Sequence, residues 1–116
     1  LAVPAINLIS QRDAIDVALR SLEHCANPPW TVNVSGPGHQ VSAITHALGN
    51  ALQCTPKLVG NEGTEAPLID DNLCLTTFGQ PRDGVVELIN GVARWVESGG
   101  ASWDKPTLFG SVNHVY

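Results

Sequence analysis

The sequence predicts a single α/β domain with a small, mainly parallel sheet of about three strands and three to four helices. Short apolar, partly β-branched segments alternate with segments whose apolar residues recur every three or four positions. The 116 residues are 43% hydrophobic and 15% charged, enough for one core and too few for two. Neither a repeat nor a linker divides the chain, so we expect residues 1–116 to form one domain.

The first predicted strand covers residues 5–9 and leads directly into a helix. Ser10 is a suitable N-cap residue, and Asp13 follows three positions later, as in a weak capping box. Apolar residues then recur at helical spacing as far as Leu22, and Asn27-Pro28-Pro29 ends the segment.

A second unit of the same kind follows. Residues 30–34 are β-prone, and residues 35–38 have the composition of a turn or loop. Ser42 is the expected cap of a helix that runs to Leu52, and residues 57–59 are a third short strand. The order up to this point is βαβαβ, which is typical of a parallel sheet.

The remaining elements are helical. Residues 60–67 form a polar loop, after which Asp70 or Asp71 can cap a short helix that ends at Gly79. Asp83 is expected to open the last helix, and Gly99-Gly100 to end it. Its apolar positions predict a main core element: Val85, Leu88, Ile89, Val92, Trp95 and Val96.

The net charge and the cysteine content limit which partners and which cellular compartment we expect. Six basic residues against eleven acidic ones give a net charge of −5, which argues against nucleic acid as a partner. The longest apolar runs are far too short to span a membrane. Three cysteines are an odd number and suggest reduced, buried thiols, so we expect a cytoplasmic protein. The chain begins with Leu and contains no Met, which predicts a processed or truncated chain.

Few residues carry recognisable chemistry. The glycines of Gly36-Pro37-Gly38 lack the spacing of a dinucleotide fingerprint, and Pro37 removes an amide donor, so a plain turn is favoured. His39 and His46 do not have metal-ligand spacing, and the sequence predicts no metal site. Gln11 and Arg12 follow the first strand, where ligands of α/β proteins gather, and are candidate contact residues.

The ordered pattern of these segments resembles the C-terminal, substrate-binding lobe of extended short-chain dehydrogenase/reductases, the NAD-dependent epimerase/dehydratase family. The run from Ile6 to Leu22 resembles the strand and helix that open that lobe. Val32-Asn33-Val34-Ser35-Gly36-Pro37 with Val41-Ser42 resembles its next unit, and residues 63–67 and 85–96 complete the order over roughly residues 5 to 109.

The resemblance implies a lobe that holds a small-molecule substrate against NAD(P) bound by another domain. The family's glycine fingerprint and its Tyr-x-x-x-Lys are absent, since the sole tyrosine is Tyr116. We therefore expect no catalytic and no cofactor-binding residues in this chain. The candidate substrate contacts are Asn7, Gln11, Arg12 and Glu65.

Three hypotheses for the function remain open. The first is the substrate-binding lobe, completed by a homo-oligomer or by a separately encoded nucleotide-binding chain. The second is a stand-alone module of the same fold that binds a small molecule or supports assembly without catalysing a reaction. The third is a small hydrolase that uses a thiol or a histidine.

The missing fingerprint leads to the first testable prediction. Titration calorimetry of this chain with NAD⁺ and with NADP⁺ should show no binding, because the backbone donors for the pyrophosphate are lacking. Affinity at the micromolar level for either nucleotide would contradict the prediction.

Overall fold

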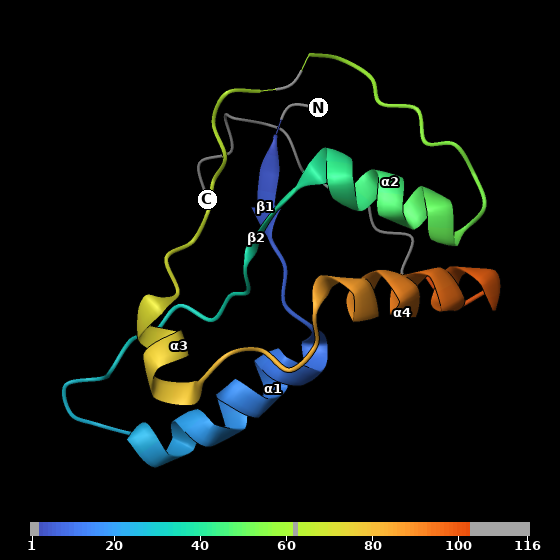
Figure 1. Cartoon of the computed structure of the whole chain (residues 1–116). Coiled ribbons are helices and arrows are strands. Elements are labelled where there is room, and N and C mark those ends of the chain that lie inside the picture. Colours follow the sequence, from blue (N-terminus) through green and yellow to red (C-terminus); the bar gives the residue numbers. More distant parts are fainter. Residues whose placement is uncertain (1–2, 62, 103–116) are drawn as a thin grey trace.

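The computed structural model describes residues 3–61 and 63–102, and Tyr116 lies outside them. The fold is α/β, as predicted, with four α-helices and a small sheet in this part of the chain (Figure 1). The elements are β1 (Ala5–Asn7), α1 (Gln11–Arg20), a 3-10 helix η1 (Ser21–His24), β2 (Gly38–Gln40), α2 (Val41–Ala51), α3 (Asn72–Phe78) and α4 (Val85–Glu97).

The sheet differs from the expected one. The structure does not confirm a mainly parallel, three-stranded sheet, because the two strands of the described residues pair antiparallel, with Ile6 opposite His39. Bonds from the amide of Leu8 to the carbonyl of Pro37 (3.2 Å) and from the amide of Val41 to the carbonyl of Pro4 (2.8 Å) continue this pairing on both sides. Residues 30–34 and 57–59, predicted as strands, are neither strand nor helix.

Two backbones come into close contact beside the antiparallel pair. Gly36 lies so near the carbonyl of Leu8 that a Cβ atom there would collide with it. Only glycine allows this contact, and residues 36–38, which were predicted as part of a turn or loop, run beside the end of β1. Residues 30–34 do not join the sheet. Instead, Trp30 and Val32 pack against the core cluster.

The predicted start of α1 and the predicted ends of α3 and α4 are confirmed. The hydroxyl of Ser10 caps α1, and Gly79, with φ of 87°, ends α3. At the end of α4, Gly99 has φ of 68°, and the amide of Gly100 bonds to the carbonyl of Trp95 at 2.8 Å. Together with the bond from the amide of Gly99 to the carbonyl of Val96 at 3.0 Å, these contacts form a Schellman motif, and Gly99-Gly100 end the helix as predicted.

Two start positions were predicted wrongly, those of α2 and α4. Helix α2 begins at Val41 after Gln40, so Ser42 lies inside it. Gly84 occupies the N-cap position of α4. Asp83, which was predicted to open this helix, instead donates its amide to the carboxylate of Asp13. Helix α3 begins where it was predicted, since Asp71 occupies the cap position, although the Asp71 side chain makes no capping bond. The carboxylate of Asp70 instead accepts the amide of Asn72 at 3.0 Å.

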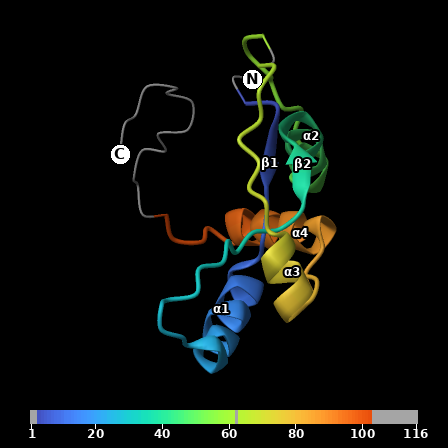
Figure 2. The same cartoon turned by 90° about the vertical axis from the view of Figure 1, so that its left-hand side faces the viewer.

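The core is small and lies between α1, α3 and the 30–34 segment. Val17, Cys74 and Phe78 are buried together, and Trp30 and Val32 cover them. Helices α2 and α4 pack side by side as a second unit. Figures 1 and 2 both show the sheet and α2 toward one end of the molecule and α1 with α3 toward the other.

The apolar stripe of α4 is only partly buried, in contrast to the prediction. Ala93 is the buried residue of this helix, and Val85, Leu88 and Ile89 are half-buried. Val92, Trp95 and Val96 are 49%, 57% and 54% exposed. The C-terminal half of the stripe therefore faces solvent, and α4 is not the main core element.

The cysteines and the helix lengths complete the comparison with the sequence. All three cysteines are free thiols, but Cys74 alone is buried, and Cys25 and Cys54 are exposed. Within residues 3–61 and 63–102, no helix has the length and apolar character needed to cross a membrane. A cytoplasmic location stays a prediction.

This distribution of burial predicts which substitutions destabilise the fold. Phe78→Ala should lower the free energy of unfolding by about 3–5 kcal/mol, because it empties the core cluster. Val92→Ala should cost less than about 1 kcal/mol, since the side chain is half exposed. Urea unfolding followed by circular dichroism measures both, and equal losses in the two variants would show that α4 is buried after all.

Candidate functional site

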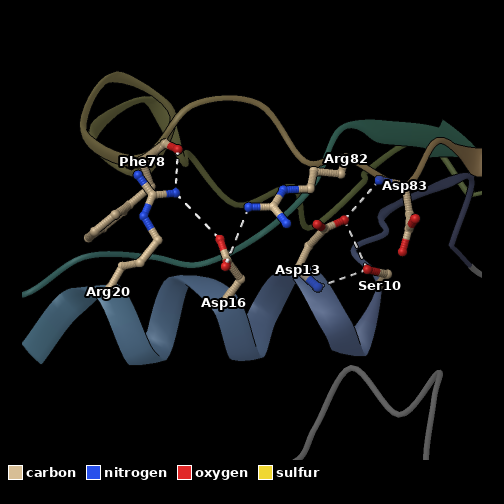
Figure 3. Close-up of polar contacts among 7 residues, drawn as sticks. All are labelled: Ser10, Asp13, Asp16, Arg20, Phe78, Arg82 and Asp83. Carbon is tan, nitrogen blue, oxygen red and sulfur yellow. Dashed lines mark hydrogen bonds and ion pairs between the residues drawn. The ribbon is translucent and has the colours of Figure 1, made fainter.

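The first turn of α1 contains a buried carboxylate, that of Asp13. Its residue is only 4% exposed. The amide of Asp13 donates to Ser10 Oγ, and Ser10 Oγ donates back to Asp13 Oδ2, both at 2.9 Å. The amide of Asp83 donates to the same Oδ2 at 3.0 Å (Figure 3). Asp13 thus joins α1 to the connection between α3 and α4.

The surroundings keep this carboxylate ionised. Burial by itself would raise the pKa of Asp13. The backbone amides of Asp83 and Arg82, the Ser10 hydroxyl and the charge of Arg12 outweigh burial and hold the pKa below its usual value. The negative charge is therefore part of the folded structure at neutral pH.

Further polar contacts extend along α1. Asp16 lies between two guanidinium groups, 3.4 Å from Arg20 and 3.6 Å from Arg82. Arg20 also donates to the carbonyl of Phe78 at 2.8 Å and lies over its ring (Figure 3). At the other end, Arg12 pairs with Asp83. Residues 78–83 are thereby attached to α1 along its length.

These contacts surround a small cleft, which we call the α1 cleft. It has a volume of about 150 Å³, and its lining includes Asp13, Asp16, Arg20, Ser35, Cys74 and Arg82. Sites for drug-sized ligands are larger, about 300–1,000 Å³. The charged groups around the α1 cleft are already engaged with one another, with Ser10 or with the backbone, and these contacts hold α1 against residues 78–83.

The thiol in the cleft is not set up as a nucleophile. Burial raises the pKa of the Cys74 thiol, and the negative charge of Asp71 adds to the effect. A raised pKa keeps the sulfur protonated, whereas catalysis requires the thiolate. Among the residues that the structure describes, no cluster of three or more His, Cys, Asp or Glu side chains could hold a metal ion.

Asn7, a predicted substrate contact, joins three segments of the chain. Its Nδ2 donates to the carbonyl of Gly36 at 2.7 Å. Its Oδ1 accepts the amide of Ile69 at 2.8 Å. The side-chain amide is therefore already occupied by backbone partners and ties β1 to the segment before α3.

The other three predicted contacts lie on the surface. Gln11 is the exposed first residue of α1, and Glu65 is exposed in the loop before α3. Arg12 is exposed and paired with Asp83. Within the described ranges, no hydrogen bond or ion pair connects any two of the four candidates, so a shared substrate site stays a prediction.

Sequence reasoning missed Asp16, Arg82 and Asp83 as members of the polar network. Their contacts with α1 span a large separation along the chain, for example 70 positions between Asp13 and Asp83. The one local signal is the acidic residue three positions after Ser10, which predicts a weak capping box but not a contact with residues 82–83.

No family model, curated protein or solved structure matches this chain. The resemblance to short-chain dehydrogenase/reductases, and with it the substrate-binding lobe and the NAD(P) partner domain, therefore stays a prediction.

The lowered pKa of Asp13 predicts a pH dependence of stability. In the unfolded chain this carboxyl binds its proton near pH 3.9, and in the folded chain only at lower pH. Its stabilisation is fully present above about pH 4 and is lost as the pH falls through the folded pKa. Asp13→Asn should cost about 1–3 kcal/mol at pH 7, and the difference from wild type should shrink below about pH 4.

Glu65→Gln is the matched control, because it also removes one carboxylate but from an exposed loop. It should change stability by less than about 0.5 kcal/mol. Urea unfolding between about pH 2.5 and 7 measures both variants. An Asp13→Asn deficit that stays constant over this range would show that the ionised carboxylate contributes nothing.

Proposed function

We propose that the chain is a non-catalytic assembly module that associates with a second copy of itself through the apolar face of α4, defined here as Val92, Trp95 and Val96. The observation that supports this proposal is the exposure of all three side chains, each about half or more. Their spacing of three and four places them on one side of the helix. Monomers rarely leave such side chains clustered in water without a use.

Trp95 is suited to be the anchor of this contact. Gly100 lies directly against its indole ring, so closely that a Cβ atom at this position would collide with the ring. The Schellman motif holds Gly100 there through its bond to the carbonyl of Trp95. A tryptophan that is already ordered loses little conformational entropy on binding, and such residues often dominate interface energies.

A second copy is the simplest partner for this face. A symmetric contact buries the same patch on both chains and closes the assembly at two subunits, which is the commonest arrangement of soluble oligomers. The net charge of −5 opposes association only weakly at physiological salt, because exposed charges are screened beyond about 8 Å.

The α1 cleft supports a non-catalytic role. Asp13, Asp16, Arg20 and Arg82 bond to one another or to the backbone of the same chain. These are contacts that maintain a fold, and the module would offer its partner a rigid helix face.

Sedimentation velocity over about 10–500 μM protein tests the proposal, a range suited to a contact of modest size. The wild type should shift from monomer to dimer as the concentration rises. Val92→Lys should weaken dimerisation at least about tenfold, because it places a charge in the apolar contact. It should not affect folding, since Val92 is half exposed.

Leu19→Lys provides the control. Leu19 is exposed on α1, outside the apolar face of α4, and the substitution adds the same charge. This variant should dimerise like the wild type. A wild type that stays monomeric throughout, or a Leu19→Lys variant that is impaired as much as Val92→Lys, would overturn the proposal.

A further inference from the structure

A second and larger depression lies between the end of α1 with η1 and residues 29–34. We call it the Trp30 groove. Its volume is about 540 Å³, within the range of about 300–1,000 Å³ that is usual for small-molecule sites. It is lined by Ala18, Ser21, Leu22, His24, Cys25, Ala26, Pro29, Trp30, Thr31, Val32 and Val34.

The lining contains no Asp, Glu, Lys or Arg. This contrasts with the α1 cleft, in which four charged side chains take part. A charged ligand would therefore lose hydration in the groove without gaining an ion pair, whereas an uncharged apolar ligand would lose little. The lack of acidic and basic side chains in the lining therefore disfavours charged ligands.

An aromatic cluster gives the groove a rigid wall. The rings of His24 and Trp30 are stacked, with centroids 5.4 Å apart and an interplanar angle of 29°. Phe78 supports both rings edge-on, at 5.3 Å from His24 and 6.0 Å from Trp30. Because Phe78 belongs to the core cluster, the wall is anchored to the interior of the protein. Flat aromatic surfaces of this kind favour planar ligands.

We propose that the Trp30 groove is a binding site for an uncharged, planar apolar small molecule, held against Trp30 and Leu22. The polar atoms at its edge, the Thr31 hydroxyl and the His24 ring nitrogens, would orient a ligand that carries one or two hydrogen-bonding groups. The site is independent of the apolar face of α4, because the two share no residue.

Cys25 offers a direct reporter for this site. Its thiol is exposed and lines the groove. Cys54 is also exposed but does not line it, and Cys74 is buried. A ligand in the groove should therefore slow the alkylation of Cys25 by N-ethylmaleimide and leave that of Cys54 unchanged, with both rates measured in the same sample by peptide mass spectrometry.

The probe is N-phenyl-1-naphthylamine, which is neutral, carries a flat naphthalene ring system and is fluorescent in apolar surroundings. We expect saturable binding of one probe per chain and at least about tenfold protection of Cys25 at saturation. Its sulfonated analogue, 8-anilino-1-naphthalenesulfonate, should bind at least about tenfold more weakly because of its charge.

Two variants test the location. Leu22→Glu places a carboxylate at the groove and should weaken binding of the neutral probe at least about tenfold. Leu19→Glu adds the same charge outside the groove and should change the affinity less than about twofold. Both side chains are exposed, so neither substitution disturbs the core.

Several results would overturn the proposal. Absence of saturable binding, equal protection of Cys25 and Cys54, or equal effects of the two variants would each exclude a specific site. A further contradicting result is protection of Cys25 that increases with protein concentration in the absence of the probe. That result would show that a second copy occupies the groove instead of a small molecule.

Discussion

The carboxylate of Asp13 is the contact on which the position of α1 depends. It connects the cap of α1, Ser10, to the backbone of Asp83, 70 positions further along the chain. Few apolar side chains are buried in the described part of the protein, so polar contacts across long separations contribute a large share of the tertiary structure. An ionised carboxylate is stable at a buried position only if its partners stay in place, which makes the arrangement cooperative.

Helices could be predicted from the sequence because their end signals are local. Ser10, Gly79 and Gly99 act within one turn of the residues they cap, and all three do so in the structure. Strand pairing could not be predicted in this way, because it depends on residues far apart in the chain. Gly36 illustrates the difficulty, since only its approach to Leu8 shows that it belongs beside a strand.

The residues around α1 show the same difference: contacts between neighbours in the sequence could be predicted, and contacts between distant residues could not. The position of Asp13 predicts a helix start, but no local pattern indicates its bond to the amide of Asp83. The period of α4 correctly indicated a helix with one apolar face. Periodicity identifies such a face but not what covers it, and Val92 and Trp95 prove to be exposed. In the proposed assembly, a second copy of the chain buries that face.

The most direct test of this account is the hydrogen exchange rate of the Asp83 amide, measured by nuclear magnetic resonance. This proton points at Asp13 in the structure, at a donor–acceptor distance of 3.0 Å. In the wild type, exchange should be at least about tenfold slower than in an unstructured peptide, and Asp13→Ala should remove this protection. Exchange at the unstructured rate in the wild type, or protection that survives in Asp13→Ala, would contradict the central role of the Asp13 carboxylate.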